Sequence, residues 1–156
     1  MRFKFVLYFF IFIFILAPML TFFHELGHAI NPLLQGLIVS IKIGEGFSVQ
    51  KIIGNLSIEI GLLKPWLGYT SWSGAHKAEL FSLILGPLFS FLFTLFLFFL
   101  GFLKRKKSYS ILLFASAGFC FFQFLFTALP MTYPGFLIHG LEKVSDGKQI
   151  LKKLNQ

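Results

Sequence analysis

The chain has 156 residues, of which 56% are hydrophobic, 24 are phenylalanines and 14 are lysine or arginine against six acidic residues. A soluble domain of this length cannot bury so much apolar side chain, so the composition predicts an integral membrane protein formed by a single domain, residues 1–156. The net charge of +8 does not gather into a basic face with interleaved aromatics, which argues against a nucleic-acid partner. One cysteine excludes a disulfide framework.

The first apolar run begins at residue 3 and continues past Pro18 through Ile30. It lacks the small-residue cleavage site of a signal peptide, so we interpret residues 3–30 as a retained membrane helix. At 1.5 Å per residue this helix is long enough to cross a hydrocarbon core about 30 Å thick. We expect Pro18 to kink it and Asn31-Pro32 to end it.

Near the end of this helix lies the stretch His24-Glu25-Leu26-Gly27-His28. Histidines spaced i and i+4 share one helical face, about 6 Å apart, which suits two imidazoles binding one zinc ion. The neighbouring glutamate is then placed to polarise a zinc-bound water. The alternative is a helix end with two interfacial histidines and a solvated glutamate. Three ionisable groups in a membrane segment are costly, which favours the metal site.

Within residues 38–69, the stretches Val39–Ile43 and Leu56–Ile60 alternate apolar and polar side chains, and Gly54-Asn55 between them is typical of a hairpin turn. We therefore expect a small membrane-associated β-hairpin or sheet between the first and second membrane helices. Trp66, Tyr69 and Trp72 suit the membrane interface. Two roles remain open for this segment: a structural plug, or an edge strand that pairs with an extended substrate.

Two further apolar runs predict membrane helices at residues 80–103 and 110–129. We expect Gly86-Pro87 to interrupt the second helix near the depth of the histidines. The hydroxyls of Ser90 and Thr94 are more typical of bonds back to the helix backbone than of catalysis.

On the third helix, Gln123 and Thr127 lie one turn apart. They either line the site or make hydrogen bonds between helices.

Three crossings place the N-terminus and the basic loop 104–107 on one side of the membrane and the C-terminal tail, residues 131–156, on the other. This topology brings His24, Glu25 and His28 to the same face as Asp146, which is one of only six acidic residues.

Most of the chain resembles the site-2 protease family of intramembrane zinc metalloproteases. The similarity lies in the order of four stretches: the zinc helix Leu16–His28, the β segment Gly44–Tyr69, the Gly-Pro motif in Leu85–Ser90, and Asp146-Gly147. The resemblance implies a mainly α-helical membrane fold with about three membrane helices. It also implies one Zn²⁺ ion, with Asp146 as third ligand beside the two histidines.

The candidate substrate-binding residues are Gly86, Pro87, Ser90 and Thr127, and the family pattern implies that positions 90 and 127 contact either the substrate or the loop of the metal site. Two of these positions depart from it, because the family usually has asparagine where Ser90 and Thr127 stand. The interval before Asp146 is longer than in the family's best-known form, which leaves His139 and Glu142 as alternative third ligands. Glycine at position 147 favours Asp146, since it permits a tight turn that aims the carboxylate into the site.

These patterns predict a zinc metalloendopeptidase in which Glu25 is the general base and a membrane protein or peptide is the substrate. Two alternatives remain open: a catalytically silent protein of the same fold that binds other membrane segments, and an intramembrane metal carrier. No serine has a histidine and aspartate at a spacing typical of a catalytic triad. We expect a multi-pass protein of the cell membrane, in contact with lipid, and the family resemblance implies a site near the cytosolic face. The oligomeric state is left open.

Overall fold

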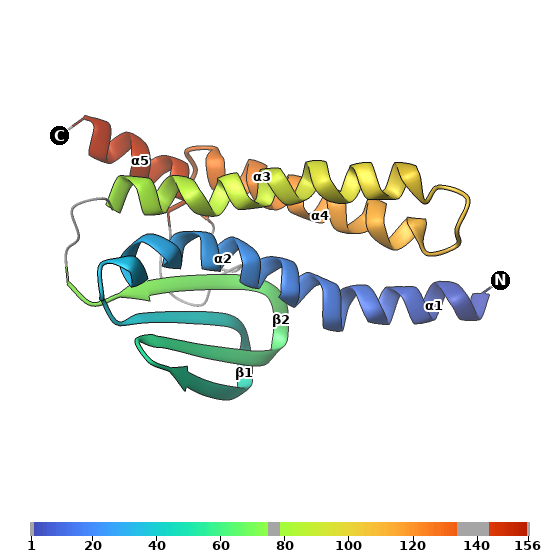
Figure 1. The fold of residues 1–156 in the computed structure, drawn as a ribbon, viewed down its shortest axis with the longest axis horizontal. Helices are drawn as coiled ribbons and strands as arrows, with labels where there is room; N and C mark the ends of the chain where they lie inside the picture. Colours follow the sequence, from blue (N-terminus) through green and yellow to red (C-terminus); the bar gives the residue numbers. More distant parts are fainter. Residues whose placement is uncertain (1, 75–78, 134–143, 156) are drawn as a thin grey trace.

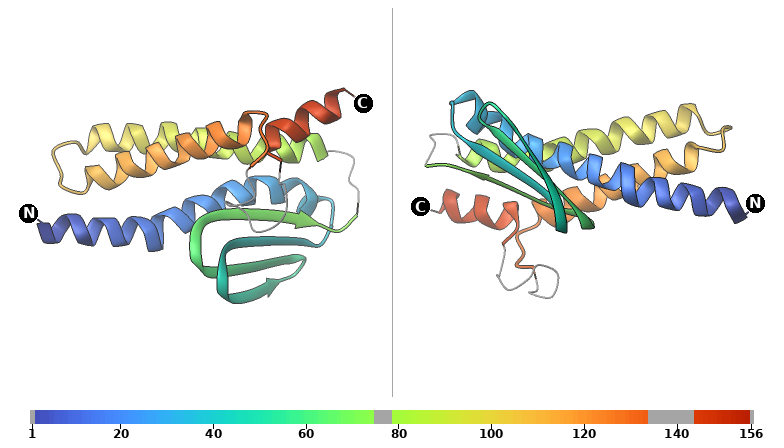
Figure 2. Two further views of the ribbon diagram at one scale, coloured as in Figure 1. Left: turned by 180° about the vertical axis from the view of Figure 1, so that it is seen from behind. Right: turned by 90° about the horizontal axis from the view of Figure 1, so that it is seen from below.

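The computed structural model describes residues 2–74, 79–133 and 144–155. One long helix is built from α1 (Arg2–Ile11), a π-helical turn η1 (Phe12–Leu16) and α2 (Ala17–Leu34). Figures 1 and 2 show this helix as a middle layer, with the helices α3 (Glu79–Leu103) and α4 (Ser110–Ala128) on one side and a sheet on the other.

The first predicted helix is confirmed, but its expected end at Asn31-Pro32 is wrong. Pro32 lies inside α2, in its last turn, where the missing N–H removes a single helical hydrogen bond. Its carbonyl is used after the helix, since it accepts from the backbone N–H of Gln35 and Leu37 at 3.1 Å each. Pro18 lies in the first turn of α2, directly after the π-helical turn, where a missing N–H is tolerated.

The sheet consists of two long strands, β1 (Val39–Ile53) and β2 (Leu56–Trp72), joined by the predicted Gly54-Asn55 turn. Around this turn the strands pair antiparallel, from Ile53 opposite Leu56 to Ser48 opposite Gly61. Both strands then bend, so that the first half of β1 lies between two halves of β2: Ile41 pairs with both Ile58 and Thr70. Residues 68–72 have β1 as their only strand neighbour and form an edge of the sheet next to α2 within the described chain.

The core between the sheet and α2 follows from the alternation seen in the sequence. Val39, Ile41 and Ile43 are buried on one face of β1 and form one cluster with Ala29 of α2. Lys42 lies on the other face and pairs with Glu59 at 2.8 Å. The buried apolar face therefore fixes the sheet against the segment of α2 that carries the two histidines.

Helix α3 runs without a break through Gly86-Pro87, so the expected interruption is wrong. An apolar helix 25 residues long can lose one hydrogen bond at proline and continue, because neighbouring helices restore its packing. The glycine serves a different purpose. A Cβ on Gly27 of α2 would lie 2.8 Å from the Leu85 carbonyl oxygen and 3.0 Å from Gly86 Cα, so the two helices touch backbone to backbone.

Three helices in the described residues are long and apolar enough to cross a membrane: Phe3–Leu34, Glu79–Leu103 and Ser110–Ala128. The predicted topology agrees with their arrangement. The loop between α3 and α4 lies at the same end as the N-terminus, where the Tyr8 hydroxyl lies 3.0 Å from Ser108 Oγ. The tail contains a short helix that the sequence analysis did not predict, α5 (Asp146–Leu154), at the opposite end (Figure 2).

Candidate metal centre

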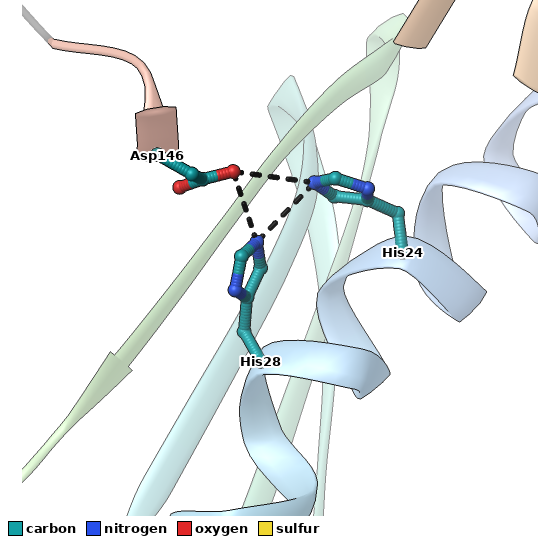
Figure 3. A group of neighbouring side chains, drawn as sticks. All are labelled: His24, His28 and Asp146. Carbon is teal, nitrogen blue, oxygen red and sulfur yellow. Dashed lines mark hydrogen bonds and ion pairs between the residues drawn. The ribbon is translucent and has the colours of Figure 1, made fainter. Parts of the chain in front are cut away.

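His24 and His28 project from one face of α2 toward the same point, as their spacing predicted (Figure 3). Their Nε2 atoms lie 3.3 Å apart, and their rings meet edge to face. Both residues are buried, with exposed fractions of 3% and 6%. Two polar rings at this depth require partners for all four of their nitrogen atoms.

Asp146 completes the group from the other end of the chain. Its Oδ2 atom lies 3.3 Å from His28 Nε2 and 3.8 Å from His24 Nε2 (Figure 3). Among the described residues, these three side chains are the group of histidine, cysteine and acidic residues that could hold a metal ion. The alternative ligands His139 and Glu142 lie outside the described residues.

The distances fit a small tetrahedral ion. Ligand atoms about 2.0–2.1 Å from a tetrahedral zinc are separated from each other by about 3.3–3.4 Å. Two of the three separations in the group are 3.3 Å and the third is 3.8 Å. Two imidazoles and one carboxylate also match the ligand set of catalytic zinc sites, which leave one position for water or substrate.

Ser145, which the sequence pattern did not single out, positions Asp146. This serine is buried, and its Oγ donates to the Leu129 carbonyl at 2.6 Å and accepts from the Met131 N–H at 2.9 Å. The same oxygen caps α5 by accepting from the Lys148 N–H at 3.2 Å. One side chain thus joins the start of α5 to the end of α4. A serine directly before an acidic first turn is a common N-cap pattern and could have indicated this helix.

Gly147 serves a purpose other than the one we expected. It lies in the first turn of α5 and does not have a positive φ, so it makes no tight turn. A Cβ at this position would overlap the Ala128 carbonyl oxygen. The glycine therefore allows α5 to approach the end of α4 closely, which brings Asp146 to the histidines.

The outer nitrogen of each histidine ring is bonded to α3. His28 Nδ1 donates to the Ser82 carbonyl at 2.8 Å, and His24 Nδ1 lies 2.8 Å from Ser90 Oγ. Gly86 lies between these two serines, and a Cβ there would overlap the His28 ring. Such bonds orient metal-ligating histidines and select their tautomer.

The remaining predicted substrate contacts, Ser90, Thr127 and Pro87, take part in hydrogen bonds or packing within the helical bundle. Ser90 Oγ donates to Gln123 Oε1 at 3.1 Å, which makes Gln123 a bridge between helices. Thr127 donates to the Gln123 carbonyl at 2.8 Å, and Thr94 bonds back to Ser90 in the same way at 2.9 Å. Pro87 is buried within α3.

Glu25 turns away from α3 and toward the sheet. The Thr70 hydroxyl donates to Glu25 Oε2 at 2.7 Å and lies 3.0 Å from the Glu25 carbonyl oxygen. A Cβ on Gly68 would overlap the Glu25 carboxylate, so only glycine lets the edge strand run this close. The edge segment 68–72 therefore forms the wall beside Glu25. Nothing in the sequence pattern indicated Thr70 or Gly68.

Tyr133, just after α4, lies within electrostatic reach of the site. Burial raises the pKa of its phenol to about 12, and the carboxylates of Asp146 and Glu25 add to the rise. The phenol donates to the Phe126 carbonyl at 2.8 Å. Tyr133 therefore remains a neutral hydrogen-bond donor at physiological pH.

In comparisons with known proteins, no family model and no curated protein matches the chain.

The geometry predicts that Asp146 is the third metal ligand. Asp146→Ala should lower the affinity for a divalent metal by more than the roughly 10–100-fold that loss of an outer hydrogen-bond partner costs. His139→Ala and Glu142→Ala should retain it. Metal content of the purified variants, measured by mass spectrometry, checks this. Loss of metal in the His139 or Glu142 variant, with metal retained in Asp146→Ala, would contradict the assignment.

Proposed function

We propose that this chain is a zinc metalloendopeptidase of the site-2 protease type, which cleaves membrane-associated or transmembrane substrates within the cell membrane. One observation carries the proposal: two imidazole nitrogens and a carboxylate oxygen converge at 3.3–3.8 Å, next in sequence to a buried glutamate, in a bundle of membrane-length helices. The resemblance of the His-Glu-Leu-Gly-His stretch to that family supports the same conclusion.

His24, His28 and Asp146 would hold the ion. Zinc, when bound, lowers the pKa of water toward 7 and polarises the scissile carbonyl. The protein residues supply the rest. Glu25 accepts the proton of the attacking water on its carboxylate and delivers it to the leaving amine. The Thr70 hydroxyl holds this carboxylate in place through its bond to Oε2.

The exposed fraction of Glu25 is only 6%, so little bulk water reaches the base. In this low-dielectric setting a single positioned carboxylate can exchange the proton with the reacting groups without competing solvent. The edge strand beside it is placed to align a substrate. An extended peptide that adds to residues 68–72 would make backbone hydrogen bonds without demanding a particular sequence. This supports the edge-strand role over the structural plug.

Glu25→Gln is expected to retain zinc and to abolish peptide cleavage, because the amide keeps the shape of the carboxylate but cannot accept the proton. The measurement is zinc stoichiometry together with cleavage of a membrane-protein substrate by the purified chain in lipid. Cleavage by the variant would show that Glu25 is not the base. A wild-type chain that binds zinc but cleaves nothing would favour the silent binding protein or the metal carrier.

Substrate pairing with the edge strand predicts a crosslinking pattern. With Cys120→Ala and Glu25→Gln as background, Ser71→Cys should form disulfides with substrate cysteines placed two residues apart, because adjacent strands bring alternate side chains within about 5 Å. Ser57→Cys is the matched control, since residue 57 has β1 on both sides and no open edge. A three-to-four-residue periodicity, typical of a helical substrate, would refute strand pairing.

We further propose that the metal centre lies toward the cytosol, as the family resemblance implies. The loop between α3 and α4 then lies outside, although its lysines and arginine are more typical of the inner side. Ser108→Cys, exposed in this loop, should react with a membrane-impermeant maleimide in intact cells carrying Cys120→Ala. Reaction only after permeabilisation would reverse the orientation.

A further inference from the structure

A chain of hydrogen bonds connects all three membrane-length helices at the metal centre. It begins at His24 on α2, whose Nδ1 lies 2.8 Å from Ser90 Oγ on α3. It continues from Ser90 Oγ to Gln123 Oε1 on α4 at 3.1 Å. His24 and Ser90 are each only 3% exposed, which shields the bond between them from bulk water, and the bond to Gln123 is part-buried.

The direction of the chain follows from the atoms in it. An amide oxygen can only accept, so the single hydroxyl hydrogen of Ser90 points to Gln123 Oε1. The Ser90 oxygen must then accept from His24, which places the ring hydrogen of His24 on Nδ1. A neutral imidazole with its hydrogen on Nδ1 presents a lone pair at Nε2.

A single backbone carbonyl holds His28 in the same tautomer. Its Nδ1 faces the backbone carbonyl of Ser82, which can only accept. Both rings then direct lone pairs at a point that Asp146 Oδ2 also faces (Figure 3). Three acceptors at 3.3–3.8 Å, with no hydrogen among them when the rings are neutral, create a site for a cation.

We propose that Ser90 and Gln123 are positioning residues that fix His24 in the Nδ1–H tautomer and so keep its Nε2 available as a ligand. The proposal deepens the metalloprotease function and rests on it only for the identity of the ion, since the tautomer exists without metal. The opposite direction, with the Gln123 amide donating to Ser90 and Ser90 to His24, would place a hydrogen on Nε2 where the ion belongs. Measurement of the tautomer distinguishes the two directions.

The tautomer can be read directly because the chain has only four histidines. We would label them with ¹⁵N, remove metal, and record two-bond ¹H–¹⁵N spectra in micelles at a pH where the rings are neutral, with assignments from single histidine substitutions. The wild type should show His24 as Nδ1–H. Ser90→Ala and Gln123→Leu should each convert it to a mixture, whereas Ser90→Thr keeps a hydroxyl and should retain it.

Ser116→Ala is the matched control, because Ser116 is buried on α4 and its Oγ has no hydrogen-bond partner among the described residues. This variant should match the wild type in tautomer and in zinc affinity. Zinc affinity, measured by competition with a chromophoric chelator, should fall about 10–100-fold in Ser90→Ala and recover in Ser90→Thr.

A wild-type His24 in the Nε2–H form, or an unchanged tautomer in both Ser90→Ala and Gln123→Leu, would overturn the proposal. If Ser90→Ala fails to fold, Gln123→Leu provides the same test from the far end of the chain. A wild type with the expected tautomer that binds no zinc would refute the metalloprotease function and leave the positioning role of Ser90 and Gln123 standing.

Discussion

The backbone contact between α2 and α3 is the constraint on which the candidate metal centre depends. Gly27 meets Leu85 and Gly86 so closely that a single Cβ would push the helices apart. Because the helices touch, three residues spaced one turn apart on α3 lie against the two histidine rings: Ser82, Gly86 and Ser90. A helix held a few ångströms farther away could not reach either Nδ1 atom.

Helix α2 bonds both α3 and the edge strand, because successive residues of a helix point in different directions. His24 and His28 share a face and turn to α3, whereas Glu25 turns to the edge strand and bonds Thr70. The ligand side and the base side of the proposed site are therefore supported by separate elements. The sheet is fixed in turn by the buried row Val39, Ile41 and Ile43 against α2.

Asp146 is held by a different kind of constraint, since it belongs to a short helix that cannot be stable alone. Ser145 bonds the end of α4 and caps α5 with one oxygen, and Gly147 lets the two helices approach. At the far end of α5, Lys153 bonds Glu79 of α3 at 2.6 Å. The carboxylate is thus placed by contacts at both ends of its helix.

The sequence by itself determined the features that depend on neighbouring residues. The length and hydropathy of three runs predicted the membrane-length helices, the i, i+4 spacing predicted that His24 and His28 share a face, and Gly54-Asn55 predicted the hairpin turn. The expected order of three membrane crossings placed Asp146 on the same side as the histidines, and the structure brings these three side chains together. These features are local, or follow from the number of crossings, so no knowledge of packing was needed.

Only the tertiary structure decided what depends on contacts between distant segments. The helix continues through Pro87 because its neighbours stabilise it, and Gly147 is required by the nearby Ala128 carbonyl rather than by a turn. Ser90, which bonds His24, and Thr70, which bonds Glu25, each lie on a different element from the residue they hold. Ser145 precedes Asp146 in the sequence, but its bonds to Leu129 and Met131 join α5 to the distant end of α4. Sequence spacing carries no information about such pairs, because their geometry exists only after the helices and the sheet have packed.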